Sequence, residues 1–370
     1  MGLETALDAR HWAPMPFPFW SAVFFVVGGV VGSFLNVVIH RLPRGESIVS
    51  PPSHCPHCQY AIPWYLNVPL VTWILLQGKC RHCGARISPR YLLVEFLTAA
   101  VFLGCWLAFG RLAPAVAAVY CVFLAGLIAA SFIDCEHFII PDELTLGGLG
   151  AGVLLSLGLP ALQGAADSAQ ALTRSLVGAG VGAGLIYGIL RLGKLLFGRH
   201  RVELAPDAKI VFTETALVLP DKEISYDELF YRKSDVVTVQ ARTVEMIDRC
   251  YRDVRLRLAP DLLEIGDDQF QPEDVPHLEA VAAEILLPRE AMGLGDVKFM
   301  AAIGAFLGWK ATVFSLFASS VIGAVIAGVP YLLRRGHGSR QIPYGPYIAL
   351  AAAVWIFWGD QVMAWVLGSR

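Results

Sequence analysis

Two aspartates at the ends of apolar segments are the residues best suited to catalysis in this chain of 370 residues. Asp134 ends one apolar segment in "SFIDCEHF", and Asp296 follows Gly293 and Gly295 in "GLGDVKF", just before another apolar segment. A carboxylate at the mouth of a membrane span is costly to keep there, so it indicates function. Two carboxylates in one site of low dielectric cannot both ionise easily. The ionised acid can then activate water while the protonated acid polarises a carbonyl, which is the chemistry of an aspartic protease.

A second group of residues has the spacing of a metal site. Cys55 and Cys58 lie in "CPHC", and Cys80 and Cys83 follow in "CRHC" after 21 intervening residues. Two C-x-x-C turns supply four thiolates, which complete the tetrahedral shell of Zn²⁺. A closed shell leaves no open position, so the predicted metal is structural and holds together a loop that has no core of its own. The alternative interpretation is four free, reduced thiols.

A third aspartate, Asp142, is interpreted differently from the catalytic pair. It directly follows Pro141 and precedes an apolar run. A carboxylate at that position can accept hydrogen bonds from the free N–H groups of a helix. We therefore predict that Asp142 is a helix cap.

The elements that must position these residues are membrane helices. The chain is 56% hydrophobic and 16% charged, with a mean hydropathy of +0.57, and its apolar residues cluster in blocks of membrane-spanning length. The length of these blocks predicts an α-helical polytopic membrane protein. About eight transmembrane helices are expected, over residues 17–39, 91–109, 112–133, 143–160, 173–197, 297–309, 311–333 and 345–367. The sixth is short and could continue into the seventh through Gly308–Lys310.

Two polar stretches interrupt the predicted helices. Residues 40–90 contain the cysteine motifs and form a loop, whereas residues 198–290 contain alternating runs such as "AKIVFTETALVLP" that predict strands. We expect the second stretch to be a small α+β or mostly-β insert. The predicted parts are 1–39 (first transmembrane helix), 40–90 (zinc-binding loop), 91–197 (helices carrying the first catalytic aspartate), 198–290 (soluble insert) and 291–370 (second catalytic aspartate and C-terminal helices).

Lysine and arginine residues in the loops predict the orientation of the helices. One set of loops carries Arg41, Arg44, Lys79, Arg81, Arg86, Arg90, Arg191, Lys194, Arg199, Arg201, Arg334, Arg335 and Arg340. The opposite set carries Arg10, Arg111, Arg174, Lys310 and Arg370. The first set is assigned to the cytoplasm, which places the loop, the insert and both catalytic aspartates on the cytoplasmic side. The net charge of −2 gives no global basic field, so no nucleic-acid partner is expected.

Taken together, these motifs resemble those of the type IV prepilin peptidases, bacterial membrane aspartic proteases with a G-x-G-D motif. The resemblance covers nearly the whole chain except the insert. It rests on the cysteine loop and on "GSFLNVVIHRLP", "ISPRYLLVE", "IDCEHFIIPDELTL", "EAMGLGDVK" and "IPYGPYIAL". It implies a multi-pass protein of the bacterial inner membrane, surrounded by the lipid bilayer, with Asp134 and Asp296 as the catalytic pair facing the cytoplasm.

The resemblance also implies two activities and a second cofactor. Such an enzyme removes the leader peptide of prepilins and pseudopilins on the cytoplasmic side, and then methylates the new N-terminus with S-adenosylmethionine. The cysteine loop and its zinc are associated with the methyltransferase half. Glu95 and Asn36 are candidates for the methyl-donor site, although a packing or capping role explains them equally well. The insert departs from the family, which usually has a short basic loop here, and it could serve particular substrates or a docking partner.

Two other classes of protein would carry some of these features. A proton-coupled transporter would favour acids in the middle of its spans and two related halves, and the sequence has neither. A non-catalytic, zinc-stapled membrane scaffold of a pilus or secretion system would explain the loop and the insert, but not the pair Asp134 and Asp296. Loss of peptide cleavage in Asp-to-Asn variants would distinguish the enzyme from both alternatives.

Overall fold

The computed structural model describes residues 15–333 and 343–366, with gaps at residues 198, 206, 221, 231–234, 247–248, 276 and 289–292. Some residues used above lie outside this part of the chain: Arg10, Arg334, Arg335, Arg340 and Arg370 of the orientation argument, and Glu290, Ala291, Met292 and Ile342 of two motifs. The chain divides into two compact units, Met1–Tyr187 with Gly293–Arg370, and Gly188–Met292. Each unit is described by itself.

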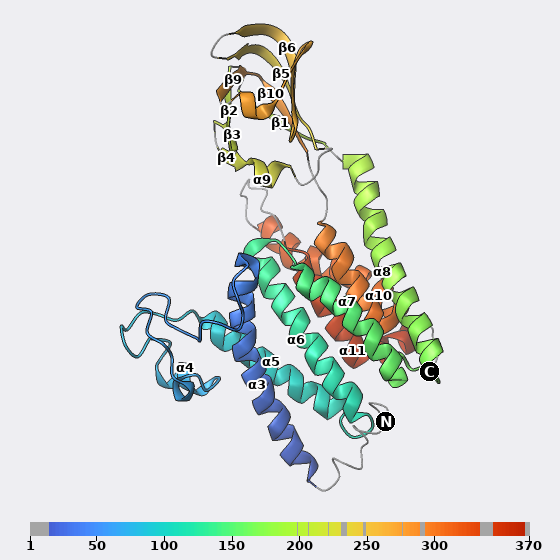
Figure 1. Ribbon diagram of the computed structural model, residues 1–370. Coiled ribbons are helices and arrows are strands. Elements are labelled where there is room, and N and C mark those ends of the chain that lie inside the picture. Colours follow the sequence, from blue (N-terminus) through green and yellow to red (C-terminus); the bar gives the residue numbers. More distant parts are fainter. Residues whose placement is uncertain are drawn as a thin grey trace. The chain divides into compact units, whose positions relative to one another are not determined.

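Apolar helices form the first unit (Figure 1). They are α3 (Phe17–Arg41), α5 (Pro89–Phe109), α6 (Pro114–His137), α7 (Asp142–Gly158), α8 (Ser168–Phe197), which runs on into the second unit, α10 (Leu294–Leu333) and α11 (Gly345–Val366). Within the described residues, five of them (α3, α5, α6, α8 and α10) are long and apolar enough to cross a membrane, and α11 contains a shorter apolar stretch. The protein is therefore a polytopic membrane protein, as the apolar blocks of the sequence predict.

The predicted segments 297–309 and 311–333 lie in one helix, α10, which is broken at Gly308. Gly308 has a φ of 76° and a ψ of 174°, a conformation that glycine adopts without steric cost. Such a break frees carbonyl groups in the preceding turn, and these need new donors. The carbonyl oxygen of Ala305 accepts hydrogen bonds from Ser156 Oγ at 3.3 Å, Gln163 Nε2 at 2.7 Å and Ser175 Oγ at 2.8 Å. Residues of α7, η3 (Pro160–Gln163) and α8 thus fix α10 at its break.

Two sets of helices pack closely in the first unit. Helix α3 lies along α5, and α10 packs against both α7 and α11. A Cβ atom at Gly32 of α3 would lie 2.7 Å from Cα of Glu95, so only glycine permits this approach. Helix α6 packs against α5 and α11, and its Phe123 stacks on Phe306 of α10 with ring centroids 4.2 Å apart. These contacts hold α6 and α10, which carry the two aspartates, in one bundle.

Residues 42–88, between α3 and α5, have little regular structure. They contain η1 (Leu42–Arg44), η2 (Trp64–Leu66) and the short helix α4 (Val71–Leu75). Two isolated bridges, His54 with Ala61 and Lys79 with Arg86, each close one of the cysteine motifs. A segment with so few internal elements depends on other interactions to hold its shape.

The second unit is built on an antiparallel sheet. Its strands are β1 (Arg199–Glu203), β2 (Lys209–Thr213), β3 (Ala216–Leu219), β4 (Lys222–Ser225), β5 (Val237–Glu245), β6 (Cys250–Ala259), β7 (Leu262–Ile265), β8 (Asp268–Phe270), β9 (His277–Val281) and β10 (Glu284–Pro288). The order is β4-β3-β2-β9-β5-β6-β7-β8, and β10 pairs with both β5 and β1. Short helical turns α9 (Tyr226–Leu229) and η4 (Pro272–Asp274) complete it. Alternating residues such as Val237, Val239 and Ile285 are fully buried and form its core.

Candidate active site and metal centre

Asp134 lies in the last turn of α6 and is buried, with 6% of its surface exposed. Its Oδ2 accepts a hydrogen bond of 2.8 Å from the backbone N–H of Gly345, the first residue of α11. A Cβ atom at Gly345 would lie 2.8 Å from the same oxygen, so the contact requires glycine. The N-terminus of a helix carries a partial positive charge, which stabilises a neighbouring carboxylate. Helix α11 therefore orients the Asp134 carboxylate.

Asp296 lies in the first turn of α10 and is 9% exposed. Its carboxylate is close enough to Asp134 for the two charges to interact. Ile140, between α6 and α7, packs against the backbone beside each aspartate: a Cβ atom at Gly345 would lie 3.1 Å from its Cδ1, and one at Gly295 would lie 3.4 Å from its Cβ. The fold therefore brings Asp134 and Asp296 into one buried site.

Asp142 is not the helix cap that the sequence analysis predicts. Pro141 occupies the N-cap position of α7, and no side chain forms a cap hydrogen bond there. Instead, Lys298 Nζ of α10 contacts Asp142 Oδ1 at 2.6 Å and Oδ2 at 2.9 Å. The carboxylate of Asp142 therefore lies against an ammonium group of another helix and not against the backbone N–H groups of its own helix. The ion pair ties the start of α7 to the turn of α10 that carries Asp296.

Lys298 is the residue of this site that the sequence analysis misses. The only signal is its position, two residues after Asp296 in "GLGDVK". On a helix that spacing points a side chain to a different face from the aspartate. Lys298 is thus a neighbour of the site that does not face the Asp296 carboxylate.

The four predicted cysteine ligands come together in the loop between α3 and α5. Their sulfur atoms all lie within 4.8 Å of one another, with Cys55 Sγ 3.9 Å from Cys83 Sγ and Cys58 Sγ 4.0 Å from Cys80 Sγ. Four sulfurs placed tetrahedrally about 2.3 Å from zinc would lie about 3.8 Å apart. All four are free thiols. The cluster therefore has the donor set and the size of a structural zinc site.

The two cysteine motifs fold into equivalent turns. The N–H of Gln59 bonds to the carbonyl of Cys55, and the N–H of Gly84 bonds to the carbonyl of Cys80, each at 2.9 Å. Gln59 and Gly84 both have positive φ, 57° and 71°. The backbone N–H groups of Cys83 and His82 bond to the Cys80 sulfur and lower the pKa of that thiol to about 7. The second turn therefore favours the thiolate form of Cys80, which is the form that binds zinc.

Asn36 of α3 and Glu95 of α5 are buried next to the cysteine loop, with 2% and 8% of their surfaces exposed. Glu95 Oε2 accepts a hydrogen bond of 2.7 Å from the N–H of Leu70, a loop residue with a φ of 63°. Asn36 Nδ2 donates to the carbonyls of Gly32 at 3.3 Å and Tyr91 at 3.1 Å. Both residues line one cavity with Cys55 and Cys80. The structure thus places the two candidates on α3 and α5, beside the cysteine cluster. Asp134 and Asp296 lie on two other helices, α6 and α10.

Comparison with known proteins identifies two family matches. The bacterial peptidase A24 N-terminal domain matches residues 26–109, and the type IV leader peptidase family matches residues 121–205 and 278–328. The matches cover the cysteine loop and both aspartates. The segment between residues 205 and 278, which holds most of the sheet, lies outside them.

Several curated proteins are similar to this chain. The prepilin leader peptidase/N-methyltransferase of Aeromonas hydrophila is 29% identical, over 95% of each chain. The protein of the same name from Dichelobacter nodosus is 38% identical over 48% of this chain and 69% of its own length. That of Myxococcus xanthus (strain DK1622) is 43% identical over 45% of this chain and 46% of its own. No solved structure matches the chain.

Proposed function

Because the chain belongs to the type IV leader peptidase family, we propose that it removes the leader peptide of prepilins and pseudopilins and then methylates the new N-terminus. The observation that carries the proposal is the pair Asp134 and Asp296, which come from separate helices and share one buried site. Paired carboxylates in a site of low dielectric are suited to peptide hydrolysis.

In hydrolysis, one aspartate acts as the general base and the other as the general acid. The ionised carboxylate takes a proton from water, and the resulting hydroxide attacks the scissile carbonyl carbon. The protonated carboxyl donates a hydrogen bond to the carbonyl oxygen and supports the negative charge that develops there. When the C–N bond breaks, the leaving nitrogen takes a proton from the site. The products are a leader with a free carboxylate and a pilin with a free amine.

We place this site on the cytoplasmic side of the bacterial inner membrane. The basic residues Arg41, Arg44 and Arg90 lie near the same ends of α3 and α5 as the cysteine loop, and positive loops remain in the cytoplasm. We also propose that the chain crosses the membrane eight times, with the two parts of α10 counted as separate spans. The sheet unit would then lie in the cytoplasm. A substrate anchored in the bilayer would then present its cleavage site where its basic leader emerges.

The cysteine cluster supports a structural zinc ion and the methyltransferase half of the proposal. Cys55, Cys58, Cys80 and Cys83 would hold the ion in a closed shell, so the metal would fix the loop and leave the chemistry to other groups. S-adenosylmethionine, when bound, supplies an electrophilic methyl group on a sulfonium ion. The loop and helices α3 and α5 would orient it and exclude water from the new amine.

Mass spectrometry of a co-expressed prepilin tests both activities at once. With the wild-type protein, the pilin should lose its leader and gain the mass of one methyl group. Asp134→Asn and Asp296→Asn variants that still insert in the membrane should leave the leader in place. Uncut prepilin in the presence of the wild-type protein would contradict the proposal and favour a scaffold without catalysis.

A further inference from the structure

A cavity of about 410 Å³ lies between the cysteine loop and helices α3 and α5. Asn36 and Arg41 of α3, Glu95 of α5 and Trp73 of α4 contribute to its wall, and Cys55 lines it from the loop. This volume falls in the range of about 300–1,000 Å³ that is usual for small-molecule sites. We call it the inner cavity.

Two polar atoms in the wall of the inner cavity lack hydrogen-bond partners. Asn36 Oδ1 is a buried acceptor and Trp73 Nε1 is a buried donor, and neither has a partner among the described residues. More than nine-tenths of buried polar groups in proteins are hydrogen-bonded. Since Asn36 uses its amide nitrogen on two backbone carbonyls, its orientation is fixed and its oxygen remains for another group. A ligand that fills the cavity could partner both atoms.

Arg41 adds a buried positive charge to the same wall. Its side chain donates to the carbonyl of Ser47 at 3.0 Å, and the residue is only 7% exposed. No carboxylate within the described ranges forms an ion pair with it, although Glu46 lines the same cavity. A buried guanidinium without an anion is costly. Arg41 therefore favours a ligand that carries a negatively charged group.

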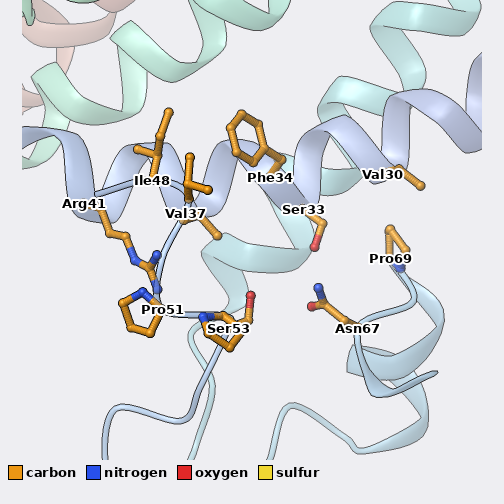
Figure 2. Close-up of a pocket in the computed structure, with 12 residues that line it drawn as sticks. Val30, Ser33, Phe34, Val37, Arg41, Ile48, Pro51, Ser53, Asn67 and Pro69 are labelled. Carbon is orange, nitrogen blue, oxygen red and sulfur yellow. The ribbon is translucent and has the colours of Figure 1, made fainter. Parts of the chain in front are cut away.

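A second, smaller pocket of about 290 Å³ shares part of its wall with the inner cavity. We call it the outer groove. Figure 2 shows Arg41 reaching from α3 towards Pro51 and Ser53, beside the groove. The residues common to both spaces are Ser33, Val37, Arg41, Ser53 and Asn67. The groove therefore adjoins the inner cavity along one face of α3.

The far wall of the outer groove is apolar and exposed. Val30 and Phe34 of α3 line it, with 55% and 48% of their surfaces exposed. Exposed apolar side chains on a helix that crosses a membrane contact lipid. The outer groove thus connects the inner cavity with the lipid-facing surface of α3.

We infer that the inner cavity binds S-adenosylmethionine and that the outer groove receives the apolar N-terminus left by leader removal. Arg41 supplies the cation for the α-carboxylate of the methyl donor, and Asn36 Oδ1 and Glu95 supply acceptors for its ammonium group. Trp73 Nε1 supplies a donor for a polar ligand atom. The amine that arrives through the groove forms the N–C bond with its lone pair, the S–C electron pair stays on sulfur, and the amine proton leaves to water. The inference rests on the proposed methyltransferase function.

Binding of two product analogues to the full-length, zinc-loaded protein in detergent tests the role of Arg41. S-adenosylhomocysteine has the α-carboxylate, and 5′-methylthioadenosine lacks the whole amino-acid end. In calorimetry, Arg41→Gln should weaken S-adenosylhomocysteine at least about tenfold, the loss expected for a charge-assisted contact. Affinity for 5′-methylthioadenosine should stay within about twofold, which is within the loss of a weak neutral contact. Arg111→Gln, which removes a charge outside the cavity lining, should change neither affinity.

Hydrogen exchange of the wild-type protein gives a readout that needs no substitution. S-adenosylhomocysteine should slow exchange in residues 46–56 and 66–76, which border the cavity, and leave residues 168–187 unchanged. Absence of protection there, or an Arg41→Gln variant that binds S-adenosylhomocysteine as tightly as the wild type, would overturn the inference. If such a result came from a protein that still methylates a co-expressed pilin, the proposed function would stand and only this site would be wrong. A wild-type protein that cleaves without methylating would overturn both.

Discussion

The backbone N–H of Gly345 donates a hydrogen bond of 2.8 Å to Oδ2 of Asp134, a residue 211 positions earlier in the chain. The contact joins the last turn of α6 to the first residue of α11. Neither helix could orient the carboxylate alone, because the last turn of a helix presents its own carbonyl groups and no free N–H groups. The start of α11 is thus part of the candidate active site, although it carries neither aspartate.

Substitution of Gly345 by alanine should therefore impair peptide cleavage. The new Cβ atom would meet Asp134 Oδ2 at 2.8 Å and Ile140 Cδ1 at 3.1 Å, so the carboxylate must move. We expect at least about a tenfold loss of cleavage rate, since a small misplacement of a catalytic group costs that much or more. A prepilin cleavage assay in detergent measures it. Gly126→Ala is the control on α6, because nothing lies within 4 Å of its added Cβ atom, and it should cleave at the wild-type rate.

Each aspartate of the pair should be indispensable. Asp134→Asn and Asp296→Asn should each lower leader cleavage by at least about a hundredfold, because hydrolysis needs one acid and one base. The measurement is the rate of conversion of a purified prepilin. Asp167→Asn, in an exposed turn before α8, should keep the wild-type rate. Near wild-type cleavage by the Asp134→Asn protein would show that the pair is assigned incorrectly.

The ion pair between Asp142 and Lys298 should support cleavage without taking part in it. Its side chains are 58% and 36% exposed, so its direct free energy should be no more than about 1 kcal/mol. Asp142→Asn should cleave more slowly than the wild type but retain measurable activity. In a double-mutant cycle, Asp142→Lys combined with Lys298→Asp should recover part of the activity that Asp142→Lys loses. Losses that simply add would mean that the pair does not position α10.

One zinc ion per chain should be found in the purified, reduced protein. Cys55→Ser with Cys58→Ser should remove it, because two thiolates cannot hold the ion in a closed shell. Metal analysis by mass spectrometry measures the content. Cys250→Ser is the control, since this exposed cysteine lies in β6 and outside the cluster. A reduced wild-type protein without zinc would contradict the assignment.

Loss of zinc should reduce methylation more than cleavage. Cys55 and Cys80 of the cluster line the inner cavity beside α3 and α5, whereas the aspartates lie on α6 and α10. Quantifying leader loss and methyl mass on the same pilin, with the Cys55→Ser and Cys58→Ser protein, compares the two activities directly. Equal losses would mean that the loop is structural for the whole enzyme.

The chemical groups were easier to predict from the sequence than their partners. Asp134 and Asp296 could be found because acids at the ends of apolar runs are rare, and the cysteines because zinc requires a fixed spacing. The ion pair of Asp142 could not, since Lys298 is 156 residues away and helix signals report only local neighbours. The local sequence predicts a helix cap at Asp142, but in the folded chain Asp142 forms a tertiary ion pair with Lys298.

Helix lengths show the same limit. The apolar run predicts an end near residue 133, but α6 continues to His137, so Asp134 is enclosed within its last turn. The sequence does not show that polar atoms of Asn36 and Trp73 lack hydrogen-bond partners, or that Arg41 lacks an ion-pair partner. Whether a buried group has a partner depends on all of its neighbours in the folded chain. Burial and partnering are properties of the folded chain.

The pairing of β1 with β10 has a consequence for how this chain could have acquired its sheet. Arg199 pairs with Pro288, so the chain enters and leaves the sheet at adjacent points. Paired Cα atoms in antiparallel strands lie about 4.5–5.5 Å apart, a gap that a tight turn can span. Residues 200–287 therefore begin and end at neighbouring points. A single insertion or deletion in the gene could add or remove this stretch, and the remaining chain would need only a short connection between the helices on either side.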